Sequence, residues 1–376
     1  MILEPILTAA VADPLPAVEI LAPAWMAHIW FILLCVLLTG YAVLDGFDLG
    51  VGIIHFLVGR TARERTVHTN VIGPIWDGNE VWLVTFGGGM FAAFPLAYGS
   101  IFSAFMVPLV IVLFCLIARA TSLEFRSKAT HWSMVLACDL LFSLASIGAT
   151  FVLGVATGAV MEGIPIDSAG NLVLPASTPG GSPGPLAEIT FAITPFTLAC
   201  GGLAVLLFAL HGAMFLNLKA TGITERRIRS IFPWLFSLFL IALLAATYLA
   251  FQDVDAVTGL TLIGTVTTIL NVLAIINLAW AMRNRGKWRC FLASTVMVTA
   301  MIVLFGSTIH PNLLVSSLDP AWNITIEHAA STQATLLTMF VVVVIGIPFV
   351  LLYTAITYWT FRGTVSVDDV PEQGSS

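Results

Sequence analysis

Two short strings place pairs of carboxylates inside otherwise apolar stretches of the chain. LDGFDLGVG contains Asp45 and Asp48, and WDGNEVW contains Asp77 and Glu80. Each pair has i, i+3 spacing, which puts both acids on one face of a helix. An ionisable side chain at membrane depth costs about 2.5–3.5 kcal/mol on insertion scales, so such an acid needs a functional or structural reason. Crowded carboxyl groups in a low dielectric can hold a proton at neutral pH and pass it on through water.

These acids matter because the chain as a whole has the composition of a membrane protein. Of its 376 residues, 59% are hydrophobic and 10% are charged, whereas a soluble domain has about 25% charged residues. We therefore expect an all-α polytopic membrane protein. The formal net charge of −6 argues against nucleic acid as a partner. The five cysteines lie in or beside apolar runs without metal-binding spacing, so they indicate neither disulfides nor a thiolate-bound metal.

Nine apolar segments are long enough to cross a bilayer as helices. Their ranges are 25–57, 75–96, 99–121, 133–159, 190–217, 230–251, 259–282, 288–308 and 333–361. With nine spans, all 15 Lys and Arg residues fall on one side of the membrane, and the opposite loops carry acids but no basic residue. The positive-inside rule makes the basic side cytoplasmic, which puts the N-terminus outside and the C-terminus inside.

From the number of spans we expect an architecture of two four-helix bundles plus one peripheral helix. We expect an extracytoplasmic arm at 1–24, a first four-helix unit with the acidic cluster at 25–159, an extracytoplasmic Pro/Gly loop at 160–189, a second four-helix unit at 190–308, an extracytoplasmic loop at 309–332, and a ninth helix with a cytoplasmic tail at 333–376. Gly46 and Gly50 have the small-xxx-small spacing that lets helices approach closely.

This topology brings the acids of the first three spans to the cytoplasmic half of the membrane. The predicted proton path consists of Asp45, Asp48, Asp77, Glu80 and Glu124, supported by Trp76, Asn79, Arg119 and Arg126. Asp139 in the fourth span is a further candidate. The alternative is structural: the acids pair with Arg60, Arg63, Arg119 or Arg126 and fasten helix ends together.

The histidines do not indicate a haem held by this chain. Of the seven, only His211 lies well inside a span, and no two are placed to face each other across a bundle. Haem ligation within a helical bundle needs such facing ligands. We therefore expect His211 to act as a hydrogen-bonding packing residue, and we expect no cofactor or metal ligand in this chain.

Three strings, in order and spacing, carry a resemblance to a known family. YAVLDGFDLGVG (41–52), WDGNEVW (76–82) and LEFRSK (123–128) resemble subunit II of the cytochrome bd-type terminal quinol oxidases. The likeness covers nearly the whole chain. The DGFD and WDGN strings are specific only in combination.

The resemblance implies a function for the predicted path. It implies pairing, as a heterodimer, with a haem-bearing subunit I that carries haem b and haem d, oxidises quinol and reduces dioxygen to water. Small single-helix accessory subunits, membrane lipid and a structural quinone are further expected associates. The acids matching Asp45, Asp77 and Glu124 would line a path for cytoplasmic protons towards the haems of subunit I. The implied location is the bacterial cytoplasmic (inner) membrane.

Two other functions remain open at this point. A proton-coupled secondary transporter would use intramembrane acids equally well. It should also have a pair of short, Gly/Pro-interrupted spans in matching halves, which the sequence lacks. A structural scaffold for subunit I would tolerate neutralisation of each acid without kinetic loss.

Overall fold

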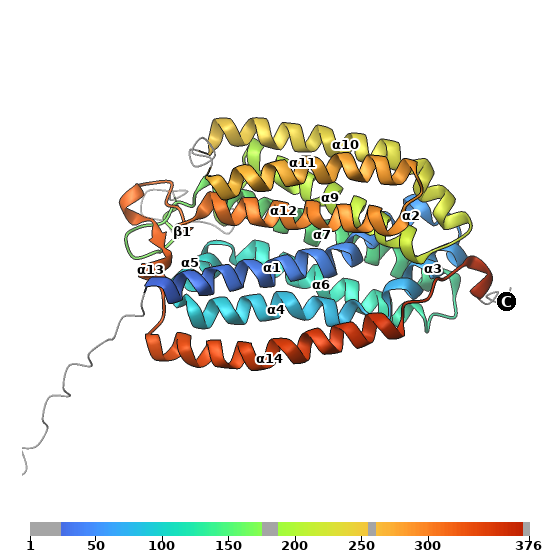
Figure 1. Cartoon of the computed structure of the whole chain (residues 1–376), viewed down its shortest axis with the longest axis horizontal. Coiled ribbons are helices and arrows are strands. Elements are labelled where there is room, and N and C mark those ends of the chain that lie inside the picture. Colours follow the sequence, from blue (N-terminus) through green and yellow to red (C-terminus); the bar gives the residue numbers. More distant parts are fainter. Residues whose placement is uncertain (1–23, 175–186, 255–260, 371–376) are drawn as a thin grey trace, which may run out of the picture.

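The computed structural model describes residues 24–174, 187–254 and 261–370, which form a bundle of long helices (Figure 1). The helices of the first half are α1 Ala24–Ile53, α2 His55–Val58, α3 Ala62–Ile72, α4 Trp76–Ala93, α5 Pro95–Ala104, α6 Met106–Arg126, α7 Trp132–Glu162 and α8 Ala187–Thr190. The second half contains α9 Pro195–Lys219, α10 Ile223–Asp253, α11 Leu262–Arg283, α12 Lys287–Ile309, β1 Asn312–Leu314, η2 Pro320–Trp322, β2 Ile324–Thr325, α13 Ile326–Ala329, α14 Gln333–Thr360 and η3 Val367–Asp369.

Eight helices of the described residues are long and apolar enough to cross a membrane, namely α1, α6, α7, α9, α10, α11, α12 and α14. The sequence-based expectation of a mostly helical, multi-pass membrane protein is confirmed. Helix α4 corresponds to the expected second span, 75–96, and runs alongside these helices (Figure 1). It is not among the eight because its first turns carry Asp77, Asn79 and Glu80, which lower its hydropathy.

The predicted third span, 99–121, has different bounds in the structure. The chain breaks at Phe94 and again at Phe105, so Pro95–Ala104 forms the separate helix α5, and α6 begins only at Met106. Pro95 stands at the first position of α5, where its missing N–H is not needed and its fixed φ favours a helix start. Residues 95–104 are as apolar as a span, so composition did not reveal the break.

Helix α1 lies at the centre of the bundle. It packs against α4, α7, α9 and α12, while α6 packs on α7, α10 on α9, and α11 on α12. The crossing of α1 and α9 is close enough that a Cβ at Gly50 would stand 1.9 Å from the Phe208 carbonyl oxygen. This confirms the predicted role of Gly50. Helix α14 packs mainly against α4 and α1 and leaves most of its surface uncovered.

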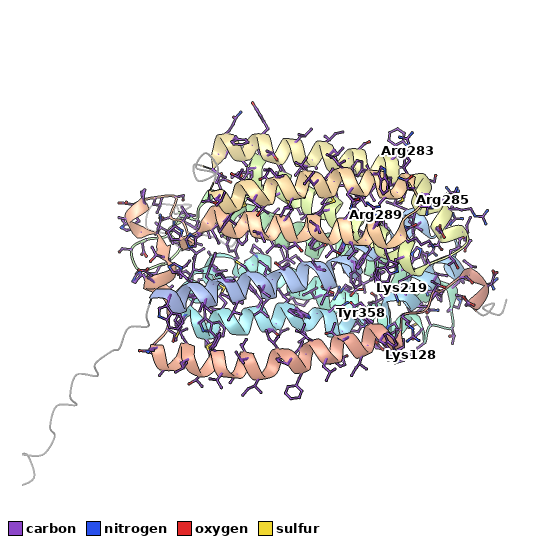
Figure 2. The ribbon with its side chains drawn as sticks, in the orientation of Figure 1. Lys128, Lys219, Arg283, Arg285, Arg289 and Tyr358 are labelled. Carbon is purple, nitrogen blue, oxygen red and sulfur yellow. The ribbon has the colours of Figure 1, made fainter. Side chains whose placement is uncertain are left out.

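The two ends of the bundle differ in structure and charge. The two-stranded antiparallel β1–β2 sheet, α5 and α13 lie at one end, and α2 and α3 lie at the other (Figure 1). Figure 2 shows Lys128, Lys219, Arg283, Arg285 and Arg289 together near the α3 end. Most of the expected arm at 1–24 and the Pro-rich part of the 160–189 loop fall outside the described residues.

Candidate functional site

The centre of the candidate site is a guanidinium held between two carboxylates from different helices. Arg119 on α6 donates from Nη1 to Asp45 Oδ1 on α1 at 2.6 Å, and from Nη2 to Glu80 Oε2 on α4 at 2.9 Å. The side chains of Arg119 and Asp45 are completely buried, and that of Glu80 is 23% exposed. The contact joins the three helices whose acids the sequence singled out. Both carboxylates rely on one cation, so removing it would leave buried charge unpaired.

A second carboxylate on α1 is held by a different set of contacts. Asp48 lies one turn after Asp45 and is also fully buried. Its Oδ2 accepts a hydrogen bond from Asn79 Nδ2 on α4 at 2.8 Å. The other end of the Asn79 amide, Oδ1, accepts from the Tyr358 hydroxyl on α14 at 3.0 Å. The three side chains form a chain of hydrogen bonds from the peripheral helix to the central one.

The composition of this buried group favours an exchangeable proton. Asp45, Asp48 and Glu80 surround a single cation, Arg119, which cannot neutralise three ionised carboxylates. Asp48 Oδ1 is buried and finds no hydrogen-bond partner in the described part of the chain. A buried acceptor without a partner is a place where a proton or an ordered water would be held.

The structure does not bring all of the predicted path residues into direct contact. Asp77, in the first turn of α4, and Glu124, near the end of α6, are both exposed on the surface of this chain. Within the described residues neither side chain forms an ion pair or a hydrogen bond with Arg119 or with the three buried acids. Trp76 is half-buried and packs against the main apolar core. The convergent acids are therefore Asp45, Asp48 and Glu80.

Asp139 and Arg126 belong to a separate polar cluster. Asp139 on α7 accepts from Arg126 on α6, from Arg65 on α3 at 2.7 Å and pairs with His55 on α2 at 2.9 Å. The sequence suggested that Asp139 could join the other acids and that Arg126 could support them, but the structure pairs these two with each other. The alternative of acids fastening helix ends describes this cluster well.

Next to this cluster, His68 on α3 lies with its Nδ1 3.3 Å from Nδ1 of His55. Burial is the largest cause that holds the pKa of His68 well below its usual value, and the nearby His55 and Arg126 lower it further. His68 therefore stays neutral and extends the cluster by one more hydrogen bond. The pairing of two histidines 13 residues apart has no periodic signal in the sequence.

A third buried charge fixes α3 to α10. Glu64 closes a capping box at the start of α3 with Thr61 and also pairs with Arg227 on α10. Arg227 Nη1 further donates to the Val58 carbonyl at 2.8 Å. Burial alone would raise the pKa of Glu64, but the hydrogen bonds from Arg227 and from the backbone N–H groups of Thr61 and Arg60 outweigh it and lower that pKa.

His211 does not fit the role of a haem ligand in this structure. Its Nδ1 lies 2.8 Å from Ser294 Oγ, and its Nε2 lies 3.0 Å from the Val43 carbonyl oxygen, so both ring nitrogens are engaged. The ring also stacks on Phe291. In residues 24–174, 187–254 and 261–370, no group of three or more His, Cys, Asp or Glu side chains could hold a metal ion.

The fold and this site define a class, a multi-pass helical membrane protein in which a buried arginine bridges carboxylates of different helices. The site lies towards the end of the bundle that carries the basic residues. A model of the family described as cytochrome bd terminal oxidase subunit II matches residues 26–361. The chain belongs to this family, which confirms the resemblance seen in the sequence, and it is a subunit of a terminal oxidase.

Individual relatives are similar to this chain over most of their length. Cytochrome bd ubiquinol oxidase subunit 2 of Bacillus subtilis (strain 168) is 32% identical over 347 residues, which cover 91% of this chain and 98% of that protein. Cytochrome bd-I ubiquinol oxidase subunit 2 of Escherichia coli (strain K12) is 29% identical over 377 residues, covering 92% and 96%. A chain of the bd oxidase from Geobacillus thermodenitrificans has the same fold, with a TM-score of 0.71, 17% identity and coverage of 90% and 99%.

Proposed function

We propose that this chain is the proton-supplying subunit of a quinol-oxidising, dioxygen-reducing membrane complex. In this proposal Asp45, Asp48 and Glu80 form the buried part of a path that accepts protons from the cytoplasm. Asp77 and Glu124 form its exposed part, on surfaces that a partner subunit covers. The path delivers protons to the partner, which holds haem b and haem d and carries out the reduction of dioxygen to water.

The observation that carries this proposal is the buried group around Arg119. Asp45 and Glu80 share its guanidinium, and Asp48 one turn further along α1 keeps an oxygen without a partner. Burial of acids in excess over bases is unfavourable for stability alone, and such sites inside membranes commonly serve proton transfer. The names of the curated relatives, which are subunits of ubiquinol oxidases, support the quinol as the electron donor.

We further propose a nine-span topology in which α4, second in chain order, crosses the membrane together with the eight apolar helices. The N-terminus would then lie outside and the C-terminus inside a bacterial cytoplasmic membrane. The basic residues gathered near the α3 end of the bundle (Figure 2) support a cytoplasmic location for that end. The exposed apolar faces of α6, α10, α11 and α14 leave ample surface for lipid, the haem-bearing subunit I and small single-helix subunits.

The experiment that tests the proposal compares two neutral variants in the complete complex. Asp48→Asn and Asp77→Asn remove one buried and one exposed carboxyl group without changing side-chain size. We expect quinol-dependent oxygen consumption to fall by about a hundredfold, the size of effect typical of a lost proton-transfer group. The haem content measured by the optical spectrum should stay at the wild-type level.

The matched control is Glu327→Gln, which neutralises an exposed acid on α13 at the opposite end of the bundle. We expect it to leave turnover unchanged. Wild-type turnover of both Asp variants, with haem intact, would contradict the proton path and leave the scaffold function. Loss of haem in either variant would assign that acid to assembly and remove it from the path.

A further inference from the structure

The structure assigns a positioning role to Tyr358, a residue outside the acidic strings: through Asn79, its hydroxyl lets Asp48 take up and release a proton without loss of hydrogen bonding. The inference rests on the proposed proton path and adds α14 to it. The juxtaposition that carries it is the chain Tyr358 Oη to Asn79 Oδ1 at 3.0 Å and Asn79 Nδ2 to Asp48 Oδ2 at 2.8 Å.

The first step of the argument concerns the direction of each hydrogen bond. An ionised carboxylate can only accept, so its bond with Asn79 requires the Nδ2 end of the amide on the Asp48 side. The Oδ1 end is then turned towards α14. Oδ1 can only accept, and the Tyr358 hydroxyl supplies the donor. Asn79 is only 2% exposed, so water does not readily replace that donor.

The second step concerns what happens when Asp48 gains a proton. A protonated carboxyl group can donate, which lets the Asn79 amide turn so that Oδ1 faces Asp48 and Nδ2 faces α14. A tyrosine hydroxyl accepts as readily as it donates, so Tyr358 then takes a hydrogen bond from Nδ2. In both protonation states Asp48 keeps a hydrogen bond with Asn79, and the two arrangements differ by one proton.

The surroundings of Asp48 leave Asn79 as the hydrogen-bond partner of its carboxyl group. The charged and titratable groups that act on it are Asp45 on the same helix, Glu80 on α4 and Arg119 on α6, besides Tyr358 itself. The two terminal nitrogens of Arg119 bind Asp45 and Glu80, and no hydrogen bond joins Arg119 to Asp48 in the described residues. Asn79 is thus the one residue of the described chain that hydrogen-bonds the Asp48 carboxyl group, and its orientation depends on Tyr358.

Helix α14 offers a matched control for the experiment. Tyr353 lies on the same helix, and its ring stands close to Gly78 of α4, where a Cβ would be 3.2 Å from the ring. No hydrogen bond of its hydroxyl is found in the described residues. Tyr353→Phe and Tyr358→Phe therefore each remove one oxygen atom from the same helix, but only Tyr358→Phe removes a contact with Asn79. Figure 2 labels Tyr358 in the half of the bundle that contains Lys128 and Lys219.

The test measures both variants in the assembled complex. The infrared C=O band of protonated Asp48, recognised because it is absent in Asp48→Asn, should shift in Tyr358→Phe and stay unchanged in Tyr353→Phe. The kcat for quinol oxidation should fall about two- to tenfold in Tyr358→Phe, the range for one lost hydrogen bond, with the KM for quinol unchanged. In an Asn79→Leu background, Tyr358→Phe should cause no further loss, because the hydroxyl acts through Asn79.

The outcomes separate this inference from the proposed function. If Asp48→Asn lowers turnover while Tyr358→Phe and Tyr353→Phe give the same band and the same kcat, the role of Tyr358 is overturned and the proton path stands. If Asp48→Asn leaves turnover unchanged, the path fails, yet a band shift in Tyr358→Phe alone would still support the hydrogen-bond chain. An equal loss of kcat in the Asn79→Leu background would also overturn the inference.

Discussion

Arg119 and Asp45 form a fully buried ion pair, with Nη1 of the arginine 2.6 Å from Oδ1 of the aspartate. The pair connects α6 to the central helix α1, and Glu80 of α4 binds the second guanidinium nitrogen. A site designed only for stability would balance its charges more evenly. Here one cation serves two acids, and a third acid lies one turn away, so the same contact holds the helices together and keeps a proton-binding group in place.

Removal of the cation should destabilise the complex strongly. Arg119→Met leaves the buried Asp45 and the partly buried Glu80 without their cation, and breaking a buried ion pair in this way costs about 3–5 kcal/mol. The control Arg226→Met changes an exposed arginine on α10. Thermal unfolding of the purified complex checks this prediction. The double variant Arg119→Met, Asp45→Asn should regain part of the loss, whereas an unchanged midpoint for Arg119→Met would show that the pair contributes little.

The close crossing of α1 and α9 gives a second prediction. In Gly50→Ala the new Cβ would clash with the Phe208 carbonyl, and forcing the helices apart should cost about 1–3 kcal/mol. Gly87→Ala on α4 is the control, because a Cβ there meets nothing within 4 Å. Thermal stability in detergent and the yield of assembled complex measure the difference. Equal stability of the two variants would mean that the crossing adjusts without strain.

The pair of Glu64 with Arg227 predicts a dependence of stability on pH. The folded protein lowers the pKa of Glu64, so the ionised acid adds stability above the pKa of the unfolded chain, and this gain disappears as the pH falls through the folded value. Wild-type protein should therefore exceed Glu64→Gln in melting temperature at pH 7, and the gap should close in acid. The exposed Glu124→Gln serves as control. A constant gap at every pH would contradict the ionic contribution.

The sequence predicted the parts of the site that depend on local spacing. The i, i+3 acids of LDGFDLGVG do lie buried on α1, and the basic residues do gather near one end of the bundle. The contact of Tyr358 with Asn79 could not be predicted, because 279 residues separate them. The structural alternative did name Arg119 and Arg126 as partners of the acids, but which acid meets which arginine depends on how the helices pack. Helix α5 was missed because its composition matches that of a span.

The central claim is that buried carboxylates of this chain carry the protons used in dioxygen reduction. Its most direct test is time-resolved proton uptake from the cytoplasmic side when the fully reduced complex, reconstituted in vesicles, reacts with dioxygen. The account predicts that Asp48→Asn slows this uptake by about a hundredfold, while electron transfer to the haems before the first proton-dependent step keeps its wild-type rate. Proton uptake at the wild-type rate in Asp48→Asn, with the complex intact, would contradict the account.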